Sequence, residues 1–188
     1  MASASPRRAQ LLRQIGIVFT ARPAGVDESR HTGESPAAYV ERLAVAKAAA
    51  RAAAGTLSIG ADTAVMLDDR VFGKPAGRAD AVNMLMALGD RTHLVLTAVA
   101  ISDGARVRSE CVTTQVTFGP VTAALAEAYW ATGEPADKAG GYGIQGIGGI
   151  FVQSINGSYS AVVGLPLAET ERLLRDFGVD TWHARSHV

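Results

Sequence analysis

The sequence predicts an α/β protein in which a mixed β-sheet is flanked by helices. Segments with the period of an amphipathic helix are interspersed with strand-like runs along the whole chain. The dipeptide Asp103-Gly104 stands between two such runs and is a strong hairpin signal, which places antiparallel neighbours in the sheet. The chain has 188 residues, of which 48% are hydrophobic and 19% charged, and this suffices for one domain with a buried core.

The charge balance and the single cysteine narrow the class of protein. The 18 basic and 18 acidic residues give a net charge of zero, which argues against nucleic acid or a membrane surface as a partner. Cys111 is the only cysteine, so no internal disulfide forms, and this fits a cytoplasmic protein. Its place in a strand-like run favours a buried, inert thiol over a nucleophile. No apolar run is long enough to span a bilayer.

The chain opens with a helix start whose charge is unusual. Ser5-Pro6 is a hydroxyl N-cap followed by proline, and it predicts a helix over residues 6–15 with Gly16 beyond its end. The first turn of a helix favours acidic residues, yet Arg7 and Arg8 stand there. A bound anion reverses that preference, because free N–H groups, serine hydroxyls and guanidinium groups together form a phosphate site. The alternative is that both arginines pair with carboxylates elsewhere.

A strand and an acidic loop are expected next. Residues 17–21 have the composition of a strand, and the polar residues 23–34 predict a loop that contains Asp27 and Glu28. The two carboxylates are oxygen ligands for a hard cation. Without further observations, a solvated acidic loop is the more common interpretation.

Ser35-Pro36 repeats the helix start and predicts a helix over residues 36–54 that stops at Gly55. Lys47 lies beside the apolar stripe of this helix. A lysine there either extends its ammonium group to solvent along its own stem, which is the commoner case, or serves a site. The stripe itself consists of Tyr39, Leu43, Ala46 and Ala50.

The next strand, expected over residues 57–67, contains the best candidate for a catalytic group. Asp62 lies inside this apolar run, and Gly60 before it allows another group to approach the backbone closely. A carboxylate in such a place needs a partner, a metal or a chemical role, and a structural aspartate that caps a turn is the alternative. Thr63 beside it bonds either a ligand edge or its own backbone.

Lys74 lies in Gly73-Lys74-Pro75 at the end of a short extended segment that follows a turn at Asp68-Asp69. Strand ends are where α/β sheets place ligands, although an ordinary exposed lysine before a turn is the alternative. His93 opens a later strand and is more often a hydrogen-bonded structural residue than a catalyst. The remaining elements are expected as a helix over 79–88, strands over 93–101 and 106–118, a helix over 122–132, a strand over 150–155 and a helix over 166–177.

Residues 137–146 form the densest glycine segment of the chain. Its glycines allow close approach of a ligand, and Gln145 offers both a donor and an acceptor to the edge of a base. The glycine spacing also matches a dinucleotide-binding turn, but the segment does not join a strand to a long helix, so we reject that interpretation. A purely structural loop is the alternative.

Taken together, these segments resemble the Maf family of nucleoside triphosphate pyrophosphatases over nearly the whole chain. Each piece is short, but they follow one another in the family's order, which makes the match specific. The pieces are Ser3-Ala4-Ser5-Pro6-Arg7-Arg8, residues 43–47, Gly60-Ala61-Asp62-Thr63, Lys74-Pro75, residues 137–146 and Gly164-Leu165-Pro166-Leu167.

The resemblance implies a Maf-like, ITPase-like α/β fold with two lobes and an active cleft between them. Residues 1–179 would then form a single catalytic domain, and residues 180–188 a polar tail. In that tail His183 and His187 are four residues apart, but a third ligand is missing, which argues against a metal site. Only Met1 and Ala2 precede the first motif, so the family's first strand is very short or the true start lies upstream.

The activity that the resemblance implies is hydrolysis of a nucleoside triphosphate between its α- and β-phosphates, with a divalent cation (Mg²⁺ or Mn²⁺). The products are the monophosphate and pyrophosphate. Asp62 matches the family's general base, and Glu28 matches an acidic residue that helps Asp62 to hold the metal. The phosphate-handling positions of the family match Ser3, Arg7, Lys47 and Lys74.

The resemblance also implies a substrate. Family members that act on dTTP and UTP have Arg, Thr and Gln at the positions of Arg8, Thr63 and Gln145, whereas the branch that acts on 7-methyl-GTP tends to have Trp, Gln and Glu. This chain has the first set, which favours dTTP, UTP and modified pyrimidine nucleotides. A non-catalytic nucleotide-binding regulator of cell division and septum formation is the alternative, and broad removal of noncanonical purine nucleotides is a third possibility. A homodimer is also expected from the resemblance.

Overall fold

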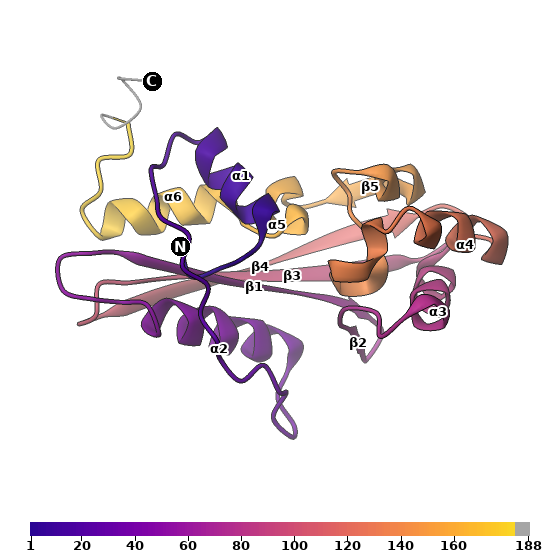
Figure 1. Ribbon diagram of the computed structural model, residues 1–188, viewed down its shortest axis with the longest axis horizontal. Coiled ribbons are helices and arrows are strands. Elements are labelled where there is room, and N and C mark those ends of the chain that lie inside the picture. The colour runs from indigo at the N-terminus through magenta and orange to yellow at the C-terminus, as the bar shows by residue number, and fades with distance from the viewer. Residues whose placement is uncertain (183–188) are drawn as a thin grey trace. The chain divides into compact units, whose positions relative to one another are not determined.

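The computed structural model describes residues 1–182 and has the α/β class that the sequence predicts (Figure 1). Five strands form one sheet in the order β2-β1-β3-β4-β5. The helices are α1 (Pro6–Gln14), α2 (Pro36–Ala49), α3 (Arg78–Leu88), α4 (Ala123–Ala131), α5 (Tyr159–Val163) and α6 (Leu167–Asp176). The strands are β1 (Ser58–Leu67), β2 (Arg70–Phe72), β3 (Thr92–Ser102), β4 (Val107–Phe118) and β5 (Val152–Asn156).

The strand pairing follows from the turns between the strands. β2 pairs antiparallel with β1, and β5 pairs antiparallel with β4. β3 and β4 are joined by the predicted turn, where Asp103 N donates to the carbonyl of Arg106 at 3.3 Å. The sequence predicted a mixed sheet, and the pairings of β2 and β5 are antiparallel.

The chain divides into two compact units. The first contains Met1–Asp62, Thr97–Val112 and the chain from Gly164 onward, and the second contains Thr63–Leu96 and Thr113–Val163. Strands β1, β3 and β4 each contribute residues to both units. Asp62 and Thr63, neighbours in β1, are therefore assigned to different units.

In the first unit, both cap-and-proline starts form helices as predicted. Ser5 accepts a hydrogen bond from Arg8 N, and Ser35 accepts one from Ala38 N. α2 ends at Ala49, earlier than predicted. After it, Arg51 N and Ala52 N bond to carbonyls three residues back, as in turns, instead of four residues back, as in an α-helix. The buried face of α2 differs from the predicted stripe and consists of Val40, Leu43, Ala44, Lys47 and Ala48.

The strand predicted over residues 17–21 is wrong. This segment is irregular: Ile17 N donates to the carbonyl of Leu12 at 3.0 Å, Met1 N donates to the carbonyl of Thr20 at 2.7 Å, and Arg22 N donates to the carbonyl of Met1 at 2.9 Å. These isolated bonds do not form the regular hydrogen-bond ladder of a β-strand. Val18 is 96% exposed, and Ile17 and Phe19 are only half-buried, so these apolar side chains do not form the buried face of a strand.

The second unit has its own core. The buried side chains of β1, β3 and β4 in this unit pack against α3, α4 and the glycine segment. Short 3₁₀ turns replace the predicted loop, at Glu134–Asp137, Ala139–Gly141 and Ile147–Phe151. The sequence missed α5, and it placed the start of the last strand two residues early, because Ile150 belongs to the third of these turns.

None of the helices in residues 1–182 combines the length and the apolar composition that crossing a membrane requires.

Candidate active site

The centre of the candidate site is a buried lysine that contacts two carboxylates. Lys47 Nζ lies 2.7 Å from Asp62 Oδ1 and 2.7 Å from Glu28 Oε1. Lys47 is 8% exposed and Asp62 is 9% exposed, whereas Glu28 is exposed. A buried ammonium group is stable only when it is paired. The expectation that Lys47 extends to solvent is therefore wrong, and its alternative, that Lys47 serves a site, gains support.

The close approach of α2 to β1 brings Lys47 and Asp62 together. A Cβ added to Gly60 would lie 2.1 Å from the carbonyl oxygen of Ala44 and 2.5 Å from the amide nitrogen of Ala48. No side chain fits there. Gly60 was expected to let another group approach the backbone closely, and within the first unit that group is the backbone of α2.

The opening motif holds Arg8 in place. Arg8 Nε donates to the carbonyl of Gly164 at 2.8 Å, and Arg8 Nη1 contacts Ser3 Oγ at 3.4 Å. Ser3 Oγ also accepts from Ser5 N at 3.1 Å. Ala2 N donates to the carbonyl of Ile59 in β1 at 2.8 Å, which anchors the motif three residues before Asp62.

The electrostatics of Arg8 connect this motif to the two carboxylates. Burial lowers the pKa of Arg8, Asp62 and Glu28 raise it, and neighbouring Arg7 lowers it. The guanidinium group therefore lies within reach of the charges of both carboxylates. Within the first unit, Lys47 thus contacts Asp62 and Glu28, and Arg8 contacts Ser3; Arg7 belongs to the same unit.

The other predicted site residues belong to the second unit. Thr63 is half-buried in β1, while Lys74 and Gln145 are exposed. Gly140 N donates to the carbonyl of Gly73 at 3.0 Å, which ties the glycine segment to the residue before Lys74. Within this unit the segment that contains Gln145 is therefore attached to the chain just after β2, next to Lys74.

Sequence reasoning missed the residue that shapes the glycine segment. The Glu134 carboxylate accepts hydrogen bonds from the Tyr129 hydroxyl at 2.7 Å, from Ile147 N at 2.9 Å and from Gly148 N at 3.0 Å. Burial raises the pKa of Glu134, but these hydrogen bonds outweigh it and the pKa lies below its ordinary value. No motif in the sequence distinguishes Glu134 from other surface carboxylates.

Two glycines of the segment owe their identity to this anchor. A Cβ at Gly146 would lie 2.3 Å from Glu134 Oε2, and a Cβ at Gly148 would lie 2.5 Å from the Tyr129 hydroxyl. Gly146 lies in the segment whose glycines were expected to allow close approach of a ligand, and Gly148 lies just beyond it. Inside the second unit they make room for the protein's own side chains instead.

The residues present fit a divalent cation that is shared with a substrate. Among residues 1–182 there is no cluster of three or more His, Cys, Asp or Glu side chains that would form a complete metal cage. Mg²⁺ is typically bound through one or two carboxylates together with substrate phosphates. Asp62 and Glu28, which meet at one ammonium group, are a donor pair of this kind.

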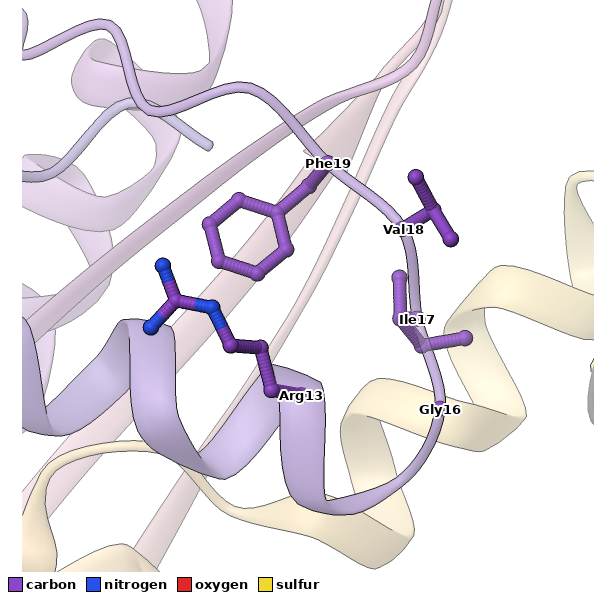
Figure 2. Close-up of a pocket in the computed structure, with 5 residues that line it drawn as sticks. All are labelled: Arg13, Gly16, Ile17, Val18 and Phe19. Atoms are coloured by element: carbon purple, nitrogen blue, oxygen red, sulfur yellow. The ribbon is translucent and has the colours of Figure 1, made fainter. Parts of the chain in front are cut away.

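A hollow with a volume of about 290 Å³ lies elsewhere in the first unit, and Figure 2 shows its lining residues. It is lined by Arg13, Gly16, Ile17, Val18 and Phe19, at the C-terminal end of α1. The Arg13 guanidinium lies over the Phe19 ring, 5.4 Å from its centroid. None of the predicted site residues lines this hollow.

The remaining candidates are structural. His93 is buried, its Nε2 lies 2.9 Å from the Tyr142 hydroxyl, and burial lowers its pKa to about 4, as expected of a structural histidine. Cys111 is half-buried rather than buried, and burial raises the pKa of its thiol, which makes it a poor nucleophile. His183 and His187 lie outside the described residues.

An α/β fold that gathers arginine, lysine and paired carboxylates fits the class of proteins that bind phosphate groups with a metal ion. The model of the family described as "Maf-like protein" matches residues 1–177, and the chain belongs to this family. A protein of Saccharophagus degradans named dTTP/UTP pyrophosphatase is 50% identical over 97% of this chain and 90% of its own length. A protein of the same name from Moorella thermoacetica is 52% identical over 97% and 96% of the two chains, and one from Pseudoalteromonas atlantica is 52% identical over 93% and 94%.

Proposed function

We propose that this protein hydrolyses dTTP, UTP and modified pyrimidine nucleoside triphosphates to the monophosphate and pyrophosphate. The observation that carries the proposal is the buried Lys47 ammonium group, which lies 2.7 Å from both Asp62 and Glu28. Relatives about half identical to this chain are named dTTP/UTP pyrophosphatase, which supports the substrate class. Removal of unwanted nucleotides from the pool would be the role of such an enzyme.

The chemistry divides among the residues of the site. Asp62 orients a water molecule and accepts its proton as the water oxygen bonds to phosphorus and the α–β anhydride bond breaks. Lys47 holds the Asp62 carboxylate in place and, with Arg7 and Lys74, neutralises the phosphate charges, while the Ser3 hydroxyl donates a hydrogen bond to a phosphate oxygen. When bound, a Mg²⁺ or Mn²⁺ ion held by Glu28 and Asp62 supplies charge stabilisation for the leaving pyrophosphate.

Recognition of the base is assigned to Arg8, Thr63 and Gln145. A pyrimidine with a keto edge accepts hydrogen bonds from the guanidinium and amide donors, and a base without that edge leaves those donors unpaired. The fixed position of Arg8, bonded to Gly164 and Ser3, supports its part in this recognition.

A panel of normal and modified triphosphates, with pyrophosphate detection and with or without Mg²⁺ or Mn²⁺, tests the proposal. We expect pyrophosphate and monophosphate in equal amounts from dTTP and UTP, only when the metal is present. Binding of the nucleotides without pyrophosphate release would instead support a regulator of cell division. Preference for noncanonical purine nucleotides would contradict the assignment of the base-recognising residues.

A further inference from the structure

Glu28 occupies an unusual position for a residue of a metal site. It lies on an irregular segment between α1 and α2, and its side chain is 57% exposed, yet its carboxylate reaches the buried Lys47 at 2.7 Å. An exposed glutamate on an irregular segment samples many conformations, and holding it in one costs conformational entropy. The backbone at Glu28 must therefore be restrained by something else.

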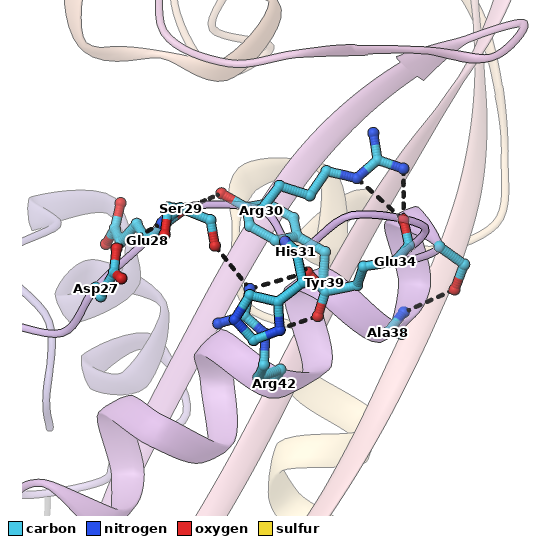
Figure 3. Close-up of polar contacts among 10 residues, drawn as sticks. Asp27, Glu28, Ser29, Arg30, His31, Glu34, Ala38, Tyr39 and Arg42 are labelled. Carbon is cyan, nitrogen blue, oxygen red and sulfur yellow. Dashed lines mark hydrogen bonds and ion pairs between the residues drawn. The ribbon is translucent and has the colours of Figure 1, made fainter.

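Two side chains of α2 hold the backbone at this point (Figure 3). The Tyr39 hydroxyl donates to the carbonyl of Glu28 at 2.9 Å, and Arg42 Nη2 donates to the carbonyl of Ser29 at 2.9 Å. The two bonds fix consecutive peptide groups. Tyr39 and Arg42 are three residues apart, so they lie on one face of the helix.

The other end of the loop is tied to the same arginine. Glu34 accepts from Arg42 Nε at 2.6 Å and from Arg42 Nη2 at 2.9 Å, and its carboxylate also accepts from His31 N at 3.1 Å (Figure 3). The planar guanidinium group suits this two-pronged contact, which a lysine does not reproduce. Arg42 therefore binds the loop both at Ser29 and at Glu34.

We propose that Tyr39 and Arg42 are positioning residues that hold Glu28 against Lys47 and so prepare the metal site. Tyr39, Arg42 and Lys47 all belong to α2. Helical side chains lean toward the N-terminus of their helix, so Lys47 leans toward the helical turns whose side chains bind the backbone at Glu28. One rigid helix thus supplies both the cation that Glu28 contacts and the groups that fix its backbone. The inference deepens the proposed function and rests on it, because it assumes that Glu28 serves the metal.

The test measures Mn²⁺ binding in the presence of a non-hydrolysable α,β-imido analogue of dUTP, followed by electron paramagnetic resonance. Tyr39→Phe removes only the hydroxyl, and Arg42→Lys keeps the charge but loses the fork. We expect each to weaken Mn²⁺ binding by about 10-fold, the lower range for loss of a partner that orients a metal ligand. Thermal midpoints should stay close to that of the unmodified protein.

Arg51→Lys is the matched control. Arg51 Nε and Nη2 donate to the carbonyl of Pro23 at 3.1 Å and 2.6 Å, so this arginine also binds the backbone before α2, but away from Glu28. Unchanged Mn²⁺ binding is expected in this variant. A loss equal to that in Arg42→Lys would show a general stiffening of the loop and would overturn the specific role of Arg42.

A double-mutant cycle with Glu28→Gln separates positioning from a merely structural role. If Tyr39 acts through Glu28, Tyr39→Phe has no further effect on Mn²⁺ binding once Glu28 is replaced. Additive losses, or Mn²⁺ binding unchanged in Tyr39→Phe and Arg42→Lys, would overturn the inference. Failure of the proposed function has a different signature, namely no pyrophosphate release by the unmodified protein.

Discussion

At the scale of single residues, the candidate site depends on the pairing of opposite charges in a region with little water. Lys47 and Asp62 are both nearly buried, and each has the other as a partner. The sequence singled out Asp62, because a carboxylate inside an apolar strand is unusual. It did not predict the burial of Lys47, since helical spacing alone cannot show which cation meets a carboxylate 15 residues further along the chain.

Glu134 and Tyr129 illustrate what sequence patterns cannot show at this scale. Sequence patterns indicate the glycine segment but not its anchor, because the Glu134 carboxylate accepts hydrogen bonds from the Tyr129 hydroxyl and from Ile147 N, and these contacts depend on tertiary structure. Gln145, whose role the sequence predicts from its amide group, lies on the segment that this anchor shapes.

Substitution of Gln145 tests recognition of the base. Gln145→Glu replaces an amide donor by a carboxylate that repels the keto oxygen of a pyrimidine, so kcat/KM for dTTP and UTP should fall by about 10-fold or more, while the thermal midpoint stays unchanged. Gln145 is exposed, which makes a folding defect unexpected. Steady-state kinetics on dTTP, UTP and GTP check the prediction, and an unchanged nucleotide preference would remove Gln145 from base recognition.

At the scale of elements, the sequence predicted the helix starts better than the helix ends. The N-caps Ser5 and Ser35 are local chemical signals, and both helices begin where these serines predict. The alanine-rich residues 50–54 favour a helix by propensity, but α2 has already ended, because turn bonds from Arg51 N and Ala52 N replace the helical ones. A strand was predicted over residues 17–21 because composition does not reveal whether a neighbouring strand is available to pair.

The contact between α2 and β1 predicts a large effect of a small change. Gly60→Ala places a methyl group 2.1 Å from the Ala44 carbonyl oxygen, so α2 must move away from β1 and Lys47 away from Asp62. We expect a loss of about 1–3 kcal/mol in the free energy of unfolding together with loss of activity. Chemical denaturation and pyrophosphate release measure the two effects.

Gly25→Ala serves as the control for this substitution. A Cβ at Gly25 meets nothing within 4 Å, so the same chemical change should leave the free energy of unfolding nearly unaltered. Equal stability of the Gly60 and Gly25 variants would show that the contact between helix and strand tolerates a side chain.

At the scale of the whole molecule, the α/β class, the order of the main elements and the family follow from the sequence. Helical and strand periodicity, together with turn signals, define the order of the elements. The family follows from several short motifs that occur along the chain in the family's order. The boundaries of the two compact units, which lie inside β1, β3 and β4, do not follow from local sequence patterns, because no linker marks them; only the family resemblance implies two lobes. Short elements such as α5 also escaped, since five residues contain too little periodicity.

The buried histidine predicts how the stability of the folded chain depends on pH. Burial lowers the pKa of His93 from 6.5 to about 4, so between these values the unfolded state binds a proton that the folded state does not. The contribution of the neutral ring to stability is complete above pH 6.5 and is lost as the pH falls to 4, by up to about 3 kcal/mol.

Denaturant unfolding at several pH values checks this dependence. His93→Gln keeps a polar group beside the Tyr142 hydroxyl but does not titrate, so its free energy of unfolding should vary less between pH 6.5 and pH 4 than that of the unmodified protein. Equal slopes in the two proteins would show that other groups cause the acid sensitivity.

The most direct test of the central claim is pyrophosphate release from dTTP by Asp62→Asn. The amide keeps an oxygen that accepts from Lys47 but cannot take a proton from water, so we predict normal folding and a loss of turnover of about 100-fold or more. A folded Asp62→Asn protein that releases pyrophosphate at nearly the unmodified rate would contradict the assignment of catalysis to Asp62.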